Sequence, residues 1–492
     1  MSVGGLLIRA DATPRMGTGH VMRGLALAQA WLDAGGTVTF AAAELPPALR
    51  ERLSSEGCAV EPVGADAAAT VAVAERVGAE WVVLDGYQFG DDSQQALRDS
   101  GRRVLAIDDY GHAGRYPADL VLNQNLGADE QLYAGRGPDT KLLLGPKFAL
   151  LRREFADAAG WERTTPEVAR KVLVTLGGAD PDNVTLAVIE ALGKVRVEGL
   201  EVVVVVGGSN PHRASLEAAA TRSPARIDLR VNVTDMPALM RWADVAVAAG
   251  GTTSWERATC RLPGLILVLA DNQQQVAAAC DEAGLSCNLG WHADVTVDRL
   301  AARLERLMID HPARAAMADQ AGSLVDGRGA KRVVRAMAGP PTVRVRPVTA
   351  DDARRVWEWA NDPVTRAASF TTAAIPWENH IRWFAAKLTD PNCVFLIAEA
   401  TNPVGQVRFD LTGDEAVISV GLAPDARGCG FGTAAIRAAV EHLTQTRPVR
   451  RVEALIRPEN VASVKAFEAA GFGPAGETTV RDYPALRYVF PR

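Results

Sequence analysis

The feature that most constrains the fold of this chain is a regular alternation of two kinds of segment. From residue 1 to about 335, short apolar runs alternate with alanine- and leucine-rich amphipathic segments. This alternation is typical of βα units, in which a strand of a parallel sheet is followed by a covering helix. Residues 202–206 are five consecutive valines, as expected for a strand buried on both faces. We therefore expect an α/β fold with strands at 6–10, 38–42, 81–85, 104–108, 171–176, 202–206, 244–248 and 265–269.

Two interruptions divide the chain into domains. The polar segment 147–167 separates the two sets of strands and predicts two Rossmann-like lobes, residues 1–150 and 151–336, with a ligand cleft between them. The sequence MAGPPT at 337–342 then ends a helix, because proline and glycine cannot continue one, and it predicts a linker. A new strand and a new amphipathic helix follow, so we expect a third domain at residues 343–492.

The composition is that of a globular enzyme. With 48% hydrophobic and 23% charged residues among 492, and a net charge of −6, the chain gives no reason to expect nucleic acid or a membrane as partner. The first residues resemble a strand rather than a signal peptide, and no apolar stretch approaches the ~20 residues of a membrane helix. The six cysteines are scattered without a CxxC pair, and no two histidines have metal-ligand spacing. We expect free thiols, no bound metal and a cytoplasmic location, while the oligomeric state stays open.

The C-terminal domain contains a glycine-rich turn between a strand and a helix. The strand 416–423 leads into PDARGCGFG and then into a long alanine-rich helix. The pattern Arg427-x-x-Gly430-x-Gly432 places glycines where backbone N–H groups and a helix N-terminus can hold a pyrophosphate. Taken alone, such a turn also occurs in many α/β proteins without this role.

The order and spacing of these segments resemble the GNAT N-acetyltransferase family over residues 343–492. The resemblance implies a mixed sheet that splays near strand 416–423, with acetyl-CoA as cosubstrate in the gap. It also implies that backbone N–H groups near Gly421 and Leu422 support the developing oxyanion. The residues implied to hold the pyrophosphate are Arg427, Gly428, Gly430 and Gly432, and those implied to contact the pantetheine arm are Asn460 and Ser463.

One position departs from that family. Many relatives have a tyrosine as general acid in the helix after the asparagine, and Phe467 stands there in this chain. Phenylalanine cannot donate a proton, so water, Tyr483 or Tyr488 takes that role, or the alignment is shifted. Glu453 is a candidate to relay a proton from the acceptor amine, although a glutamate at a strand end is more often solvated.

Two further segments indicate the acceptor. WEWANDP at 357–363 and GQVRFD at 405–410 resemble GNAT enzymes that acetylate nucleotide-linked amino sugars. The resemblance makes Asn361, Gln406 and Arg408 candidates for contact with the acceptor sugar. For Trp357 and Trp359 we favour a simple packing role in the first helix of this domain.

The N-terminal lobe carries its most informative motif at residues 9–24. A strand is followed by a turn with Gly17 and Gly19, and His20 opens a helix where the positive end of the dipole favours its neutral, basic form. Asp11 is placed to orient the ring, and Arg23 is placed one turn later to meet a phosphate. The alternative is a histidine that merely caps its own helix.

The second lobe carries three loops that follow strands: LGGADPDN, AGGTTSWE and DNQQQ. In enzymes of the GT-B architecture, loops at these places bind the nucleotide of a UDP-sugar. That resemblance assigns the diphosphate to glycines and hydroxyls, the ribose to a helix-borne glutamate, and the sugar to two amides. The corresponding residues are Gly178, Gly251, Thr252, Thr253, Ser254, Glu256, Asn272 and Gln273.

Seven motifs in order, with LDGYQ, IDDY and VDGRGAKRVV completing the set, resemble one family over nearly all of residues 1–335. This is the UDP-2,4-diacetamido-2,4,6-trideoxy-β-L-altropyranose hydrolase family of pseudaminic acid biosynthesis. The resemblance implies attack of water at the anomeric carbon with loss of UDP, His20 as general base, and Asp11, Arg23 and Tyr87 as supporting groups. The other histidines, His112 among them, have no comparable sequence setting.

These observations predict a bifunctional enzyme. The C-terminal domain would acetylate a UDP-4-amino sugar with acetyl-CoA, and the N-terminal lobes would release UDP from the diacetylated product. Two alternatives remain: a GT-B glycosyltransferase fused to an acetyltransferase, or one catalytic domain joined to a non-catalytic binding module.

Overall fold

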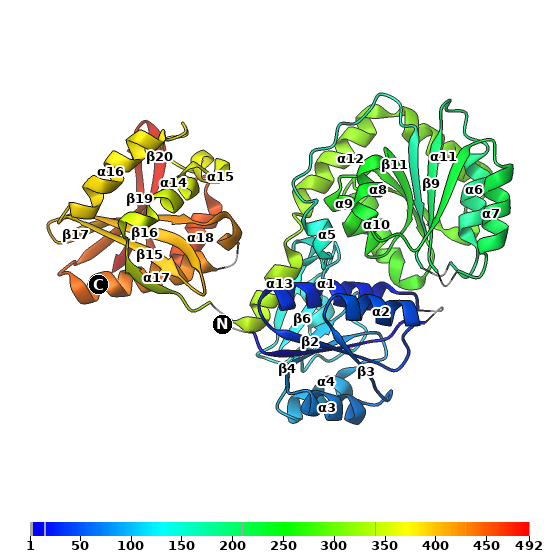
Figure 1. Cartoon of the computed structure of the whole chain (residues 1–492), viewed down its shortest axis with the longest axis horizontal. Helices are drawn as coiled ribbons and strands as arrows, with labels where there is room; N and C mark the ends of the chain where they lie inside the picture. The colour runs from blue at the N-terminus through cyan, green and yellow to red at the C-terminus, as the bar shows by residue number, and fades with distance from the viewer. Residues whose placement is uncertain are drawn as a thin grey trace. The chain divides into compact units, whose positions relative to one another are not determined.

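A computed structural model gives the structure of the chain and describes residues 3–13, 16–178, 180–208, 210–339, 341–428 and 430–491. The chain divides into two compact units, Ser2–Met337 and Ala338–Arg492 (Figure 1). The unit formed by Ser2–Met337 contains two lobes, each built on its own parallel sheet.

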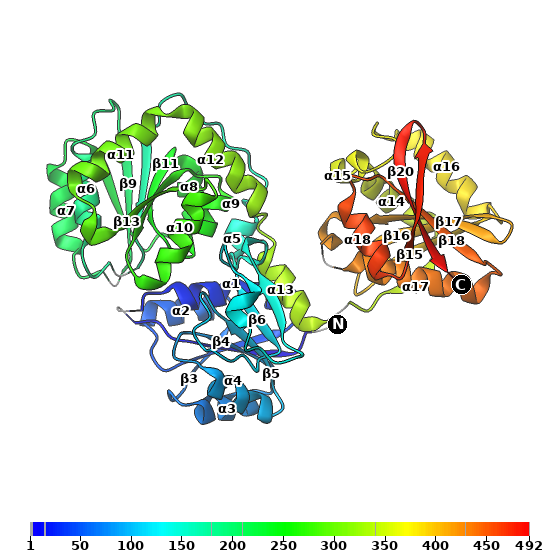
Figure 2. The same ribbon diagram turned by 180° about the vertical axis from the view of Figure 1, so that it is seen from behind.

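The sheet of the first lobe has the strand order β3-β2-β1-β4-β5-β6-β7, and its pairings are parallel. Its strands are β1 (Gly5–Ala10), β2 (Thr37–Ala42), β3 (Ala59–Pro62), β4 (Ala79–Asp85), β5 (Arg103–Ile107), β6 (Leu120–Asn123) and β7 (Lys141–Leu144). One face packs on α1 (Gly19–Asp33), α2 (Pro47–Ser55) and α13 (Gly329–Ala338). The other packs on α3 (Ala67–Arg76) and α4 (Asp91–Asp99) (Figure 2). The chain order reverses between β1 and β4, which is where open α/β sheets bind ligands.

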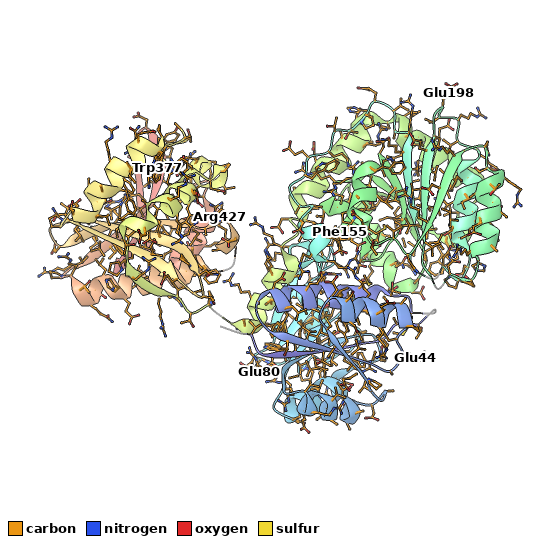
Figure 3. The ribbon with its side chains drawn as sticks, viewed as in Figure 1. Glu44, Glu80, Phe155, Glu198, Trp377 and Arg427 are labelled. Carbon is orange, nitrogen blue, oxygen red and sulfur yellow. The ribbon has the colours of Figure 1, made fainter. Side chains whose placement is uncertain are left out.

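The sheet of the second lobe has the order β10-β9-β8-β11-β12-β13 and is also parallel. Its strands are β8 (Lys171–Thr175), β9 (Glu201–Val206), β10 (Arg226–Val231), β11 (Val245–Ala249), β12 (Gly264–Val268) and β13 (Cys287–Trp291). Helices α6 (Val184–Leu192), α7 (Arg213–Arg222) and α11 (Val297–Ile309) cover one face. The other face packs on α5 (Arg153–Ala156), α8 (Met236–Trp242), α9 (Thr253–Thr259) and α10 (Gln274–Glu282), and Phe155 of α5 is fully buried there (Figure 3). Helix α12 (His311–Leu324) contributes to both cores, and the order of strands reverses between β8 and β11.

Each of the eight strands expected from the apolar runs coincides with an observed strand to within two residues. The runs did not point to β3, β6, β7, β10 or β13. The residues of β3, β10 and β13 are largely half-buried or exposed, and β6 and β7 are only four residues long, so none of the five gives a long apolar signal. Helix α13 packs its Ala330, Val333 and Met337 into the core of the first lobe. The sequence order had suggested that this segment belongs to the second lobe, so its return to the first is a finding of the structure.

The second unit is built on a mixed sheet with the order β14-β15-β16-β17-β18-β20-β19. Its strands are β14 (Arg344–Pro347), β15 (Cys393–Glu399), β16 (Pro403–Thr412), β17 (Glu415–Leu422), β18 (Arg451–Ile456), β19 (Gly473–Val480) and β20 (Tyr483–Pro491). Helices α17 (Phe431–Thr446) and α18 (Val461–Ala469) pack in one core, and α14 (Ala353–Asn361) and α16 (Trp377–Thr389) in the other. Helix α15 (Pro363–Ala367) follows α14 directly.

The sheet of the second unit splays where the sequence predicted a gap. Strand β17 pairs with β16 along its whole length, up to Leu422 opposite Gly405. Its parallel pairing with β18 stops at Ile418 opposite Ala454. The last four residues of β17 therefore have backbone groups on one edge that no neighbouring strand pairs, and this leaves room for a ligand with amide groups of its own.

Among the residues that the structure describes, no helix combines the length and the apolar character needed to cross a lipid bilayer.

Candidate functional site

The first candidate site lies at the carboxyl ends of β1 and β4, where the strand order of the first lobe reverses. His20 stands on the first turn of α1, and Asp85 is the last residue of β4. The His20 Nδ1 lies 2.6 Å from Asp85 Oδ1, and the Asp85 carboxylate is fully buried. Burial alone would disfavour the ionised carboxylate, but the charges of Arg23 and His20 hold the pKa of Asp85 at about 2. Because an ionised carboxylate only accepts, Nδ1 carries the proton of this contact and Nε2 is the ring nitrogen left without that partner.

Asp11 does not contact the His20 ring, so the expectation that it orients the ring is wrong. Its Oδ1 accepts from Arg9 Nη1 at 2.7 Å and from the Ala43 N–H at 2.7 Å. Its Oδ2 accepts from Gln88 Nε2 at 3.0 Å. Asp11 therefore fastens the loop after β1 to neighbouring loops, and Asp85 at the end of β4 occupies the orienting position.

Arg23 is buried between two carboxylates, one turn after His20. Its guanidinium donates to Asp85 Oδ2 and Oδ1 at 2.7 and 2.6 Å and to Asp109 Oδ1 at 2.9 Å, and 4% of the side chain is exposed. Burial lowers the pKa of an arginine, yet Asp109 and Asp85 together raise the pKa of Arg23 well above its usual range. The contact with phosphate that we expected for Arg23 would require these ion pairs to break.

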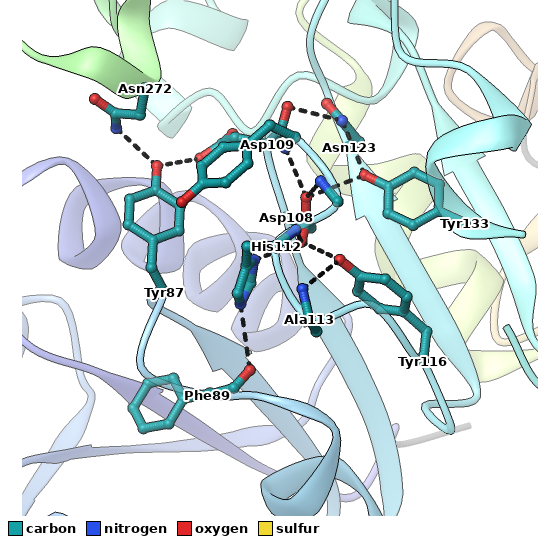
Figure 4. A network of polar contacts seen from close by, with 12 residues as sticks. Tyr87, Phe89, Asp108, Asp109, His112, Ala113, Tyr116, Asn123, Tyr133 and Asn272 are labelled. Carbon is teal, nitrogen blue, oxygen red and sulfur yellow. Dashed lines mark hydrogen bonds and ion pairs between the residues drawn. The ribbon is translucent and has the colours of Figure 1, made fainter. Parts of the chain in front are cut away.

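Tyr87 connects this cluster to the second lobe. Its hydroxyl donates to Asp109 Oδ2 at 2.8 Å and accepts from Asn272 Nδ2 at 2.7 Å, as Figure 4 shows. Burial and the negative charge of Asp109 raise the pKa of Tyr87, so the phenol stays protonated. Asn125 donates to the remaining oxygen of Asp109 at 2.9 Å. The structure therefore brings His20, Tyr87 and Asn272 into one site that both lobes build.

The glycine loops of the two lobes approach each other beside this cluster. Gly17 has φ +74, which favours glycine, and neither it nor Gly19 has an atom within 4 Å of the place where a Cβ would stand. A Cβ on Gly178 would lie 3.3 Å from Thr18 of the first lobe. Asp180 accepts from the N–H groups of Val184 and Thr185, so a carboxylate of the LGGADPDN loop occupies the N-terminus of α6.

The residues of the other two loops of the second lobe, AGGTTSWE and DNQQQ, have different surroundings. The space beside Gly251 is open, and Thr252 and Thr253 at the start of α9 are partly exposed. Ser254 is 3% exposed and its buried hydroxyl has no hydrogen-bond partner among the described residues, which places it behind the loop surface. Gln273 Oε1 accepts from the N–H groups of Gly250 and Leu269, so this amide holds the DNQ and AGG loops together.

Glu256 forms a pair with an arginine that the motifs did not single out. Arg152 Nη1 lies 3.0 Å from Glu256 Oε1, and 11% and 13% of the two side chains are exposed. Burial raises the pKa of Glu256, and the charge of Arg152 opposes that rise. The LRREF sequence contains Arg152, but only the packing of α5 against α9 shows which residue it meets.

The second candidate site surrounds the gap between β17 and β18. Gly428 and Gly430 have φ +67 and +65, and Gly430 is the residue before α17, so a backbone cradle opens at the N-terminus of that 16-residue helix. Gly421 and Leu422 end β17 within the unpaired stretch. Gly432 packs near Leu422 and Ala466. Cys429 lies outside the described residues.

Arg427 points to the segment after α14 (Figure 3). Its Nη1 donates to Asp362 Oδ1 at 2.5 Å, and its Nη2 donates to Thr365 Oγ1 at 2.8 Å. Asp362 also accepts from the N–H groups of Val364 and Thr365 and so caps α15. Arg427 thus ties the glycine loop to the corner between α14 and α15.

Asn460, Ser463 and Phe467 lie on or next to α18. Asn460 Oδ1 accepts from the Ser463 N–H at 3.1 Å and caps the helix. Phe467 is 4% exposed and packs edge-to-face on Phe472, so it belongs to the core. Of the two tyrosines considered as proton donors, Tyr488 donates to Glu468 at 3.0 Å and the Tyr483 ring lies under Arg457.

The residues predicted to meet the acceptor have different surroundings. Asn361 exchanges two hydrogen bonds with the backbone of Ile375 and holds that loop. The buried Oε1 of Gln406 has no hydrogen-bond partner among the described residues, and Gln406 lies opposite Gly421 in the sheet. Arg408 donates to Asp410 and covers the Trp383 ring. Glu453 accepts from Arg487 Nε at 2.7 Å.

Five of the cysteines, Cys58, Cys260, Cys280, Cys287 and Cys393, are free thiols. Among the described residues, no group of three or more histidine, cysteine or acidic side chains is placed to hold a metal ion.

Comparison with known proteins assigns the second unit. Residues 342–473 match the family model described as the acetyltransferase (GNAT) domain. The C-terminal region carries a GNAT acetyltransferase domain. Together with the paired parallel sheets of the first unit, this confirms the expected fold class, a GT-B-like pair of Rossmann-like lobes followed by a GNAT domain.

The chain also has relatives in carbohydrate biosynthesis. It is 29% identical over 231 residues to the spore coat polysaccharide biosynthesis protein SpsG of Bacillus subtilis, an alignment that covers 47% of this chain and 67% of SpsG. It is 25% identical over 217 residues to the UDP-2,4-diacetamido-2,4,6-trideoxy-β-L-altropyranose hydrolase of Campylobacter jejuni, which covers 44% of this chain and 74% of the hydrolase. Among solved structures, MurG of Acinetobacter baumannii overlaps 68% of this chain and 99% of its own, with 15% identity and a TM-score of 0.48.

Proposed function

We propose that this chain is a bifunctional enzyme of nucleotide-sugar metabolism. The GNAT domain acetylates the amino group of a UDP-4-amino sugar with acetyl-CoA. The two-lobed unit then hydrolyses UDP-2,4-diacetamido-2,4,6-trideoxy-β-L-altropyranose and releases UDP. The observation that carries the hydrolase half is the buried His20–Asp85 pair at the switch point, in a chain with a hydrolase of that name among its relatives.

The chemistry of the hydrolase half follows from the state of the His20 ring. With Nδ1–H held by Asp85, Nε2 accepts a proton from water as the water oxygen bonds to the anomeric carbon. The bond between the anomeric carbon and the UDP oxygen breaks, and UDP leaves with the electron pair. Asp85 also stabilises the imidazolium that forms, in the same way as the carboxylate of other histidine–aspartate pairs.

The groups that bind the UDP-sugar come from both lobes. Tyr87 of the first lobe and Asn272 of the second, joined through the phenol, are the candidates to contact the sugar. Gly17, Gly19 and Gly251 border open space suited to the diphosphate, and Gly178, Thr252 and Thr253 are the further candidates to contact it. Glu256, which pairs with Arg152, is the candidate for the ribose hydroxyls. In this proposal residues 1–150 and 151–336 supply the two functional lobes, with α13 packed back on the first lobe, and 337–342 is the linker to the acetyltransferase at 343–492.

The acetyltransferase half rests on the splayed strands and the glycine cradle. The backbone of Gly428, Gly430 and Gly432 and the start of α17 are suited to the pyrophosphate of acetyl-CoA, and the unpaired end of β17 is suited to its amide arm. The backbone near Gly421 and Leu422 is then placed to support the oxyanion. Gln406 and Glu453 are the candidates to contact the acceptor amine. Phe467 is buried in the core and cannot donate a proton, so water or Tyr488 is the proton donor in this proposal.

The experiment separates the two halves. Purified protein is incubated with UDP-2,4-diacetamido-2,4,6-trideoxy-β-L-altropyranose alone, and separately with the matching UDP-4-amino sugar with and without acetyl-CoA, while UDP and free CoA are measured. We expect UDP from the diacetylated substrate without further addition, and from the amino sugar only when acetyl-CoA is present. UDP release that requires a second sugar acceptor would instead identify a glycosyltransferase and refute the hydrolase half.

A further inference from the structure

A second histidine–aspartate pair lies beside the first. Asp108 directly follows β5, the neighbour of β4 in the sheet, and His112 Nδ1 lies 2.6 Å from Asp108 Oδ2. The carboxylate is fully buried, while 11% of the His112 side chain is exposed. In the sequence His112 has no setting comparable to that of His20, but the structure pairs it with Asp108.

Tyr87 lies between the two histidine rings. The Tyr87 ring centroid is 5.2 Å from that of His20 and 5.6 Å from that of His112, with interplanar angles of 81° and 79°. Figure 4 shows His112 below the Tyr87 hydroxyl, which contacts Asp109 and Asn272. The two rings therefore restrict Tyr87 from two sides, and its hydroxyl is held between Asp109 and Asn272.

The Asp108 carboxylate is held as firmly as Asp85. It accepts from the Tyr116 hydroxyl at 2.5 Å, from the N–H groups of Tyr110 and Gly111 at 2.7 and 2.6 Å, and from the Tyr133 hydroxyl at 3.3 Å. Burial opposes its ionisation, but His112 and Tyr116 with these N–H groups hold the pKa of Asp108 at about 2. Asp108 is therefore a permanent anion beside the ring.

The charge of His112 follows from its neighbours. Burial disfavours the imidazolium, but the contact with Asp108 and its charge outweigh this and raise the pKa of His112. Asp109 acts in the same direction, and the Phe89 carbonyl lies 3.4 Å from Nε2. The other titratable groups that face the ring are the phenols of Tyr87 and Tyr110, whose pKa values are raised, so they stay neutral.

We propose that His112 and Asp108 form a positioning pair that holds Tyr87 in place for the hydrolytic reaction. This inference rests on the proposed hydrolase function. His112 does not reach the reacting atoms: it acts through Tyr87, whose hydroxyl contacts Asp109 and Asn272. The pair is tightest while His112 is charged, and it loosens as pH rises through the pKa of His112 and the imidazolium loses its proton.

The decisive variant is His112→Phe, which keeps a ring against Tyr87 and removes the charge. We expect kcat for UDP release from UDP-2,4-diacetamido-2,4,6-trideoxy-β-L-altropyranose to fall about tenfold at pH 7 with KM within about twofold. The decline of wild-type kcat that accompanies deprotonation of His112 should disappear from the pH profile of the variant. A purely structural role would lower the melting temperature and leave the shape of the pH profile unchanged.

A matched control and a second readout keep the inference testable. His292→Phe changes a partly buried histidine 3.6 Å from Asp182 in the second lobe, and it should leave the pH profile of UDP release as in the wild type. Titration of the histidine ring nitrogens of the wild-type protein by NMR needs no turnover. We expect a protonated Nδ1 and a pKa above about 6.5 for His112. An ordinary or lowered pKa, or wild-type kcat and pH profile in His112→Phe, would overturn the inference, whereas a wild-type protein that releases no UDP would refute the proposed function instead.

Discussion

The two candidate sites of this chain are held in place by different means. At the switch point of the first lobe, His20, Arg23, Asp85 and Asp109 form a chain of buried charges in which each side chain fixes the next. In the GNAT domain, the backbone itself forms the site: two glycines with positive φ, the start of α17 and the unpaired end of β17.

This difference predicts different kinds of sensitivity. A buried charge that loses its partner remains buried, which typically costs about 3–5 kcal/mol, so side-chain substitutions should affect the first site strongly. A backbone cradle depends on conformation, so the second site should respond mainly to substitutions of glycine and of the residues that hold the loop.

The largest effect is expected for Asp85→Asn. The amide can no longer hold Nδ1–H as an anion does, so the ring loses its favoured tautomer, and kcat for UDP release should fall by about 10³-fold or more. Release of UDP is the measurement, with circular dichroism to verify folding. The matched control is Asp91→Asn, which removes an exposed carboxylate paired with Arg115 at the start of α4, and it should retain wild-type kcat. Comparable loss in both variants would contradict a special role for Asp85.

The next largest effect is a loss of folding stability at low pH. The pKa of Asp85 is lowered from 3.8 to about 2, so its ionised form stabilises the folded lobe above pH ~4, and this stability is lost as pH falls through about 2. The loss amounts to about 2 kcal/mol for this group. Urea unfolding of wild type and Asp85→Asn at pH 5 and pH 2.5 measures it: the gap between the two proteins should shrink at the lower pH. A constant gap would show that Asp85 is not the titrating group.

A smaller effect is expected for Gly430→Ala, which tests the backbone cradle. An L-residue in the left-handed region costs about 1–2 kcal/mol, so the affinity for CoA should fall about tenfold while UDP release stays unchanged. Calorimetric titration with CoA measures the affinity. Gly413→Ala is the matched control, because Gly413 has φ +62 in the turn between β16 and β17, away from the cradle. Equal losses of CoA affinity in the two variants would contradict the cradle.

The smallest effect is expected for Asp362→Asn. Asparagine still caps α15 but loses the ion pair with Arg427, worth about 1 kcal/mol, so the glycine loop is held less firmly and the Kd for CoA should rise several-fold. Calorimetric titration with CoA measures the change. Asp390→Asn, which removes a carboxylate paired with Lys387, serves as the control and should keep the wild-type affinity. An unchanged Kd for CoA in Asp362→Asn would show that this ion pair does not hold the cradle.

Much of the fold was predictable from the sequence because its signals are local. Continuous apolar runs marked the buried strands, as at Val202–Val206, and glycines marked the turns that need positive φ, as at Gly17 and Gly430. The half-exposed edge strands β3 and β10 gave no such signal, since none of their residues is fully buried.

The sequence by itself determined the βα order of the first unit, the place of the glycine loops and the presence of His20 at a helix start. These depend on hydrophobic periodicity and on conformational preferences within a few residues. Only the tertiary structure decided which carboxylate meets His20. Asp11 is nine residues away and Asp85 is 65, yet the pairing of β1 with β4 brings Asp85 to the ring and turns Asp11 to Arg9. The same packing gave His112 its partner and placed Tyr87 between two histidines, because parallel strands that are distant in sequence end side by side.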